Sequence, residues 1–167
     1  MNVSPVFLMK FKNTIERILH VKGNYNGGIL EMAVVIDHKL SKECVQMVVP
    51  QLLRTLKMHS EIFRNVRLNM VEWCSDDAIT AQATPMSMAG LSGYYEGYLQ
   101  QSEKKDFLKL VSYLKLFQAR AKVIILLTDT GYEISSQEGV KAAMQPFLDK
   151  KLMQVVVSGE MFDVWYR

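Results

Sequence analysis

Two short runs of apolar, mostly β-branched residues constrain the fold of this chain more than any other feature. Residues 32–36 and 123–127 are apolar at every position, and each run is followed closely by an aspartate, Asp37 or Asp129. A strand that is buried on both faces has this composition, as do parallel strands that lie under helices. The two runs therefore predict strands of a largely parallel sheet that is covered on both sides.

Periodic patterns place further elements around these two runs. Helical spacing of apolar residues predicts helices over Pro5–His20, from Ser41 to residue 56, over Lys104–Gln118 and after Ser136. Further strands are expected at Val66–Trp73, Ala78–Thr84 and Leu152–Val157, and residues 162–166 alternate as an edge strand does. The strands at 66–73 and 78–84 are so close in sequence that they must pair antiparallel. The chain is therefore expected to form a three-layer α/β sandwich, with a mostly parallel central sheet and one antiparallel edge hairpin strand.

Composition and length narrow the class of protein. The 167 residues fit a single domain, 1–167, in which an N-terminal helix at 5–20 packs on a core at 30–157. No apolar run approaches the ~18–20 residues of a membrane helix, and the first ten residues lack a signal-peptide pattern. The net charge of +3 is too small to indicate nucleic-acid binding. Because Cys44 and Cys74 form no metal or redox spacing, a reduced, cytoplasmic setting is expected. From the charge and the apolar runs, neither a nucleic acid nor a membrane is expected as partner.

Candidate site residues lie where the buried strands end. Ligands of open α/β sheets bind beyond the carboxyl ends of the strands, so Asp37 and Asp129 are expected at the same edge of the sheet. The polar loop Ser87–Ser92 is a third candidate for this edge. Carboxylates and hydroxyls suit a hard cation such as Mg²⁺. The same aspartates also suit turns or helix caps, and the residues alone leave both interpretations open.

Enzyme motifs are largely missing from the sequence. There is no glycine-rich phosphate loop and no Gly-x-Ser-x-Gly elbow, and Lys39 stands where a dehalogenase-type phosphatase needs its second aspartate. His38 lies beside Asp37, but the sequence places no nucleophile next to it. A small α/β hydrolase that uses Asp37, His38 and Asp129 is therefore an alternative interpretation rather than the favoured one.

The order of these segments resembles a von Willebrand factor A domain. The segment from Met32 to Ser41 is similar to that family's first strand and its Asp-x-Ser-x-Ser motif. Residues 71–78 (Val-Glu-Trp-Cys-Ser-Asp-Asp-Ala) resemble its hairpin, and residues 123–131 resemble its strand ending in Thr-Asp-Gly. The resemblance covers about 30–157 and implies the family's fold and a role in protein binding.

The resemblance also implies a set of site residues. In the family, a Mg²⁺ ion is held at this site and an acidic residue of the partner protein completes its coordination. Asp37 matches the first aspartate, Ser41 the second serine and Asp129 the later aspartate, while Ser92 is the best candidate for the family's threonine. Thr130 displaces the glycine that follows the last aspartate. These matches imply Asp37, Ser41, Ser92 and Asp129 as the metal ligands of a functional site.

Lys39 is the main departure, because it replaces the family's middle serine. An ammonium group cannot ligate a cation. If Lys39 points into the site, it is expected to replace the metal and pair with Asp37 and Asp129; if it points outward, a weak Mg²⁺ site survives. We favour loss of the metal and expect no cofactor, with Mg²⁺ as the alternative.

The predicted function is therefore a protein-interaction module with a degenerate adhesion site, part of a cytoplasmic multiprotein complex. We use "rim" for the surface formed by residues 37–41, 87–92 and 129–132. The rim residues expected to contact the partner are Asp37, His38, Lys39, Ser41, Ser92, Asp129 and Thr130. A Mg²⁺-dependent adhesion module is the first alternative. Family members add a helix and a strand after the equivalent of 155–157, and the Pro5–His20 helix is expected to cover the face that this helix would cover.

Overall fold

The sheet has the predicted mixed architecture. The computed structural model describes residues 5–6, 8–10, 12–13, 29–58, 65–85, 98–145, 151–156 and 161–166. Its strands are β1 (Ile29–Asp37), β2 (Asn65–Trp73), β3 (Ile79–Pro85), β4 (Val123–Thr128), β5 (Lys151–Val156) and β6 (Met161–Tyr166). They form one sheet in the order β3-β2-β1-β4-β5-β6. The four inner strands are parallel, whereas β3 and β6 pair antiparallel at the two edges.

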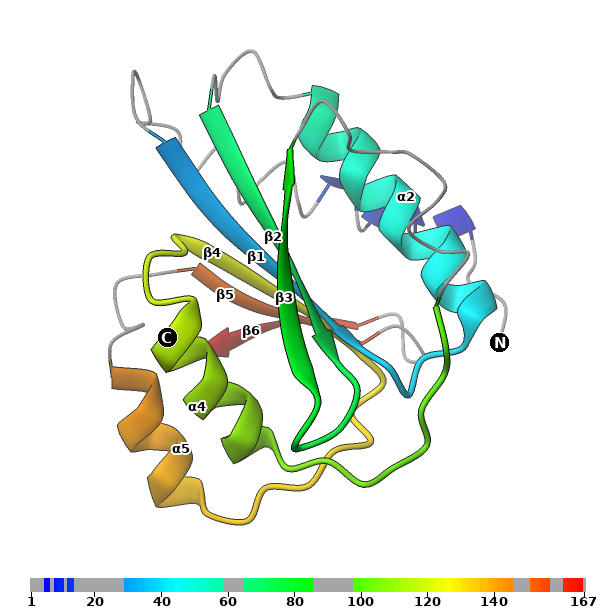
Figure 1. Ribbon diagram of the computed structural model, residues 1–167. Coiled ribbons are helices and arrows are strands. Elements are labelled where there is room, and N and C mark those ends of the chain that lie inside the picture. The colour runs from blue at the N-terminus through cyan, green and yellow to red at the C-terminus, as the bar shows by residue number, and fades with distance from the viewer. Residues whose placement is uncertain are drawn as a thin grey trace.

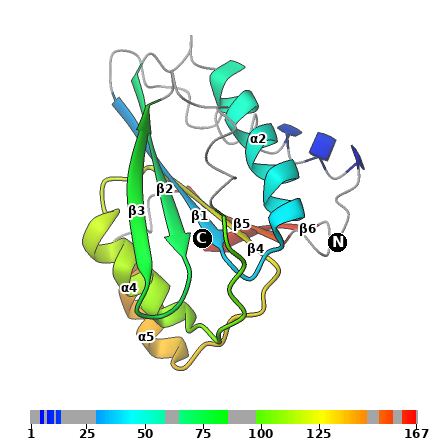
Figure 2. The same cartoon turned by 45° about the vertical axis from the view of Figure 1, so that its right-hand side comes forward.

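Helices cover both faces of this sheet, which confirms the three-layer α/β prediction. Helix α2 (Lys42–Met58) lies on one face, and α4 (Phe107–Phe117) and α5 (Gln137–Met144) lie on the other (Figures 1 and 2). The described residues between 5 and 13 are helical and lie on the side of α2. Residues 14–28 fall outside the described part of the chain, so the packing of a 5–20 helix on the core stays a prediction.

The pleat of the sheet divides the core between the two faces. Side chains alternate along a strand, so residues 33 and 35 of β1 face the opposite layer from residues 32, 34 and 36. The cluster under α4 and α5 is fully or almost fully buried; it includes Ala33, Val35, Val71, Trp73, Phe107, Leu110, Val111, Leu114, Ile124 and Leu126. Each large apolar side chain buried in this way contributes about 1.5–3 kcal/mol to folding.

Capping residues fix where the helices begin. The Cys44 N–H donates to Ser41 Oγ at 3.2 Å, and the Gly139 N–H donates to Ser136 Oγ at 3.0 Å. Helix α4 begins at Phe107, later than predicted, because Asp106 is its N-cap. Lys105 therefore precedes the helix instead of lying on its surface. None of the helices in the described ranges is long and apolar enough to cross a membrane.

Candidate functional site

Three neighbouring parallel strands end side by side at the carboxyl edge of the sheet. Asp37 is the last residue of β1 and pairs with Trp73, the last residue of β2. Ile36 pairs with Leu127, which brings Thr128, the last residue of β4, beside Asp37. Because side chains alternate along strands, Asp37, Trp73 and Thr128 continue the face that packs under α4. Register and pleat thus bring one carboxylate, one indole and one hydroxyl to a single place.

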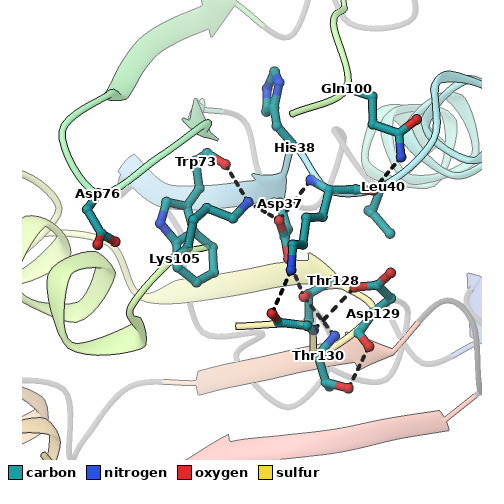
Figure 3. A network of polar contacts seen from close by, with 12 residues as sticks. Asp37, His38, Leu40, Trp73, Asp76, Gln100, Lys105, Thr128, Asp129 and Thr130 are labelled. Carbon is teal, nitrogen blue, oxygen red and sulfur yellow. Dashed lines mark hydrogen bonds and ion pairs between the residues drawn. The ribbon is translucent and has the colours of Figure 1, made fainter. Parts of the chain in front are cut away.

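The Asp37 carboxylate is fully buried, and each of its oxygens accepts hydrogen bonds. Thr128 Oγ1 donates to Oδ2 at 2.6 Å, and the backbone N–H of Lys39 donates to Oδ1 at 3.0 Å. Oδ1 also accepts from the ammonium group of Lys105, with which it forms a buried ion pair (Figure 3). A buried carboxylate has to be compensated in this way, because an unpaired buried charge is strongly destabilising.

Lys105 is held as firmly as the carboxylate. Its side chain, like that of Asp37, is 0% exposed. The ammonium donates a second hydrogen bond to the backbone oxygen of Trp73 at 2.9 Å and lies 4.7 Å from the centre of the Trp73 ring. Burial lowers the pKa of Lys105, and the hydrogen bond and negative charge of Asp37 oppose this shift. The contacts with Asp37 therefore offset part of what burial costs the ammonium.

Lys39 makes a different contact from the one the sequence predicted. Its ammonium donates to the backbone oxygen of Gly131, in the loop that follows β4, at 2.9 Å. Of the two alternatives left open for Lys39, the structure does not show its ammonium paired with Asp37: the lysine that pairs with Asp37 is Lys105, because Asp37 faces the layer of α4. Lys39 contributes its backbone N–H to Asp37 while its side chain bridges two loops of the rim.

The loop after β4 contains a strained turn. Thr130 has a φ of 68°, the left-handed conformation that glycine adopts readily and a β-branched residue does not. This is the position where the von Willebrand factor A pattern has glycine. The Thr130 N–H donates to Thr128 Oγ1 at 3.0 Å, and Asp129 Oδ1 accepts from the Gly131 N–H at 3.3 Å. Asp129 thus lies at the same edge as Asp37, and its carboxylate caps its own turn (Figure 3).

His38 is buried and points away from Asp37 (Figure 3). Its Nδ1 donates to the backbone oxygen of Leu99 at 2.9 Å, since a carbonyl oxygen only accepts. Its Nε2 lies 3.3 Å from Glu72 Oε1, and its ring packs 4.5 Å from the ring of Tyr98. Nδ1 is therefore committed to a backbone oxygen, whereas Nε2 lies near a carboxylate without forming a hydrogen bond. The hydrolase interpretation would need Asp37, His38 and Asp129 to converge on one point. They do not converge, because His38 points away from Asp37.

The Tyr98–Gln101 segment is fastened to the loop that follows β1. The Gln101 N–H donates to the His38 oxygen at 2.7 Å, and Gln100 Nε2 donates to the Lys39 oxygen at 2.9 Å. Tyr98 OH donates to the Leu40 oxygen at 2.6 Å. Burial and the nearby charge of Asp37 raise the pKa of Tyr98, so the phenol stays a hydrogen-bond donor. The rim is thus extended by a segment for which the sequence predicted a helix, Tyr94–Gln100; this was wrong for residues 98–100, which are not helical.

The remaining predicted site residues have separate positions. Ser41 caps α2 through its hydroxyl, so this oxygen faces a backbone N–H. Ser92 lies outside the described residues. Within the ranges that the structure describes, no group of three or more His, Cys, Asp or Glu side chains could hold a metal ion.

A divalent cation does not fit the site as these residues form it. Three donors approach the Asp37 carboxylate, namely Thr128 Oγ1, the Lys39 N–H and the Lys105 ammonium. A carboxylate accepts about four hydrogen bonds at most. An ammonium in direct contact with one of its oxygens would also repel a second positive charge. The carboxylate is therefore already compensated by a cation that belongs to the chain.

Sequence reasoning missed Lys105, Trp73 and Thr128 as parts of this site. For Trp73 and Thr128 a usable signal was present: both are the last residues of buried strands and share the alternation of Asp37. For Lys105 the signal was weaker, because a lysine just before a helix is ordinarily solvated. Asp106, a suitable N-cap, was the one local indication that Lys105 precedes the helix.

No known protein family matches the sequence, and no curated protein matches it significantly. Among solved structures, the chain is similar to the conserved hypothetical protein BatB from Bacteroides thetaiotaomicron, with a TM-score of 0.48 and 15% sequence identity. The match covers 75% of this chain and 65% of the BatB chain, so less than two thirds of that protein is spanned.

Proposed function

We propose that this chain is a protein-interaction module of von Willebrand factor A type, which binds a protein partner at its rim without a metal ion. The sheet order, the three segments that resemble the family and the position of Asp37 and Asp129 at one edge support the proposal. The setting we propose is a cytoplasmic multiprotein complex. Asp37 and His38 are buried, and the Asp37 carboxylate and His38 Nδ1 have internal hydrogen-bond partners, so neither is open to a substrate or to direct contact with a partner. We therefore place the partner contacts on the exposed residues around them.

The observation that carries the proposal is the way separate segments are joined at the rim. His38 Nδ1 donates a hydrogen bond to the Leu99 oxygen, and the Gln100 side chain donates one to the Lys39 oxygen. The Lys39 ammonium donates one to the Gly131 oxygen. These contacts join stretches that are 61 and 92 residues apart in the chain. A surface whose loops are already ordered loses little conformational entropy when a partner binds.

Exposed side chains of this joined surface are the proposed contacts. Leu99 is 68% exposed although its backbone is hydrogen-bonded to His38, and Thr130 and Gln100 are exposed as well. An exposed leucine on a fixed backbone is a suitable anchor for a partner, because its burial contributes apolar contact area and few of its neighbours must rearrange.

Two matched leucine substitutions test the proposal. Leu99→Glu changes the proposed surface. Leu116→Glu changes a comparably exposed leucine (75%) near the C-terminal end of α4, which is the end of that helix away from Lys105 and Asp37. The wild-type chain is used to capture partners from its native cells, and the affinity of the purified partner is then measured for each variant. We expect Leu99→Glu to weaken binding by at least about tenfold, and Leu116→Glu to leave it unchanged.

The same assay distinguishes the alternatives. Chelation of divalent cations should leave the affinity of the wild-type chain unchanged; binding that requires Mg²⁺ would support the metal-dependent adhesion module instead. Equal effects of the Leu99 and Leu116 substitutions would contradict the rim as the binding surface.

A further inference from the structure

The buried ammonium of Lys105 has an environment made of oxygens and one aromatic face. It contacts Asp37 Oδ1 and the Trp73 backbone oxygen, and Thr128 holds the other oxygen of the carboxylate. Moving an ammonium from water into a protein interior costs several kcal/mol before its partners compensate. An apolar side chain would pack beside Trp73 at no such cost. The positive charge is therefore the property that this position requires.

The oxygens around Lys105 are of the kinds that hard divalent cations bind. Mg²⁺ is held by one or two carboxylates and keeps several waters, and carbonyl and hydroxyl oxygens are common ligands of such ions. Lys105 contacts the carboxylate of Asp37 and the backbone carbonyl of Trp73, and the Thr128 hydroxyl is bonded to the other carboxylate oxygen, all at the ends of adjacent strands. An ammonium on a tether satisfies the same carboxylate, and neither dilution nor a chelator removes it.

We propose that Lys105 is a built-in substitute for a divalent cation at Asp37, and that shortening its side chain uncovers a site for Mg²⁺ or Mn²⁺. The inference deepens the proposed function, on which it rests for the identity of the surface: it assigns the metal independence of the rim to a residue outside the three segments that resemble the family. Lys39, which stands within the motif, leaves the ion pair itself to Lys105.

The test compares Lys105→Ser with Lys105→Met. Both substitutions remove the charge that compensates Asp37, so both are expected to lower Tm. Serine leaves space beside the carboxylate for an ion and its waters, whereas methionine fills that space with an apolar chain that cannot ligate a hard cation. We expect millimolar Mg²⁺ or Mn²⁺ to raise the Tm of Lys105→Ser in a concentration-dependent manner, and to leave Lys105→Met and the wild type unchanged.

A second substitution assigns the ligand. Asp37→Asn in the Lys105→Ser background should abolish the Tm shift and the binding of Mn²⁺ followed by electron paramagnetic resonance, because the carboxylate is the anionic ligand. If Lys105→Ser is unfolded without added cation, recovery of its circular dichroism on addition of Mg²⁺ supports the proposal. A Lys105→Ser protein that responds to neither cation, folded or unfolded, overturns it, as does an equal response of Lys105→Met.

The result is independent of the partner-binding assay. Failure of the cation response would overturn the role of Lys105 and leave the Leu99 and Leu116 comparison unaffected. Failure of that comparison would overturn the proposed function and leave the cation response of the purified variants as a separate result.

Discussion

Replacing Thr128 with valine removes the hydroxyl that links Asp37 to the loop after β4 and keeps the shape of the side chain. Thr128 is fully buried; its Oγ1 donates to Asp37 Oδ2 at 2.6 Å and accepts from the Thr130 N–H at 3.0 Å. A hydrogen bond to a charged group contributes about 1.5–3 kcal/mol, and one between neutral groups about 0.5–1.5 kcal/mol. We therefore expect Thr128→Val to lower the free energy of unfolding by about 2–4 kcal/mol.

For a domain of this length, that loss corresponds to a decrease in Tm of roughly 5–15 °C. The measurement is urea and thermal unfolding followed by circular dichroism. Thr128→Ser is the matched control, because it keeps the hydroxyl and loses one methyl group, which costs about 1 kcal/mol. Thr80→Val, at an exposed position of β3, should change stability little, since it breaks no buried contact. A Thr128→Val protein as stable as Thr128→Ser would refute the hydrogen-bond role.

Three further predictions concern the same region and its surroundings. Because Thr130 has a positive φ, Thr130→Gly should be more stable in urea unfolding than Thr130→Ala by about 1 kcal/mol; the opposite order, usual at ordinary positions, would contradict the strained turn. Burial raises the pKa of Cys44 to about 11, so iodoacetamide should modify it at neutral pH only as fast as the protein unfolds, and prompt labelling of the native protein would contradict this. Burial acts to raise the pKa of Asp106, but hydrogen bonds from Ser135 and the Leu108 N–H outweigh it and lower that pKa. Its stabilisation is therefore complete above the ordinary carboxyl range and is lost as the pH falls through the folded pKa; Asp106→Asn should show a flatter acid limb in unfolding at a series of pH values.

The parts of the fold that could be predicted are those with a local sequence pattern: an apolar run, a helical period or an alternation. The continuous apolar runs at 32–36 and 123–127 became β1 and β4, and the antiparallel hairpin became β2 and β3. The helix expected after Ser41 continues through Pro50, as its apolar period indicated. The alternation at 162–166 marked a real strand, β6, which gives the sheet a second antiparallel edge that the predicted architecture did not include.

The ion-pair partner of Asp37, Lys105, could not be predicted from a local sequence pattern. Lys105 lies 68 residues further along the chain, and it stands beside a second lysine, Lys104. The two lysines have opposite environments. Lys104 reaches Glu133 at 3.7 Å with its side chain 86% exposed, whereas Lys105 is buried. The backbone here is fixed by Asp106, which caps α4 and whose N–H donates to Asp76, and by the Lys105 oxygen, which accepts from the Glu133 N–H.

The internal ion pair has a consequence for recognition at the rim. In a metal-dependent adhesion site, an acidic residue of the partner completes the coordination of the ion, so the open coordination position determines what is bound. Here the ammonium of Lys105 is tethered and fully enclosed, and it offers a partner no such position. On the proposed function, specificity must then come from side chains that the rim exposes, Leu99 foremost among them. Binding should therefore depend on apolar contact more than on an acidic residue of the partner, and it should weaken little as the salt concentration rises.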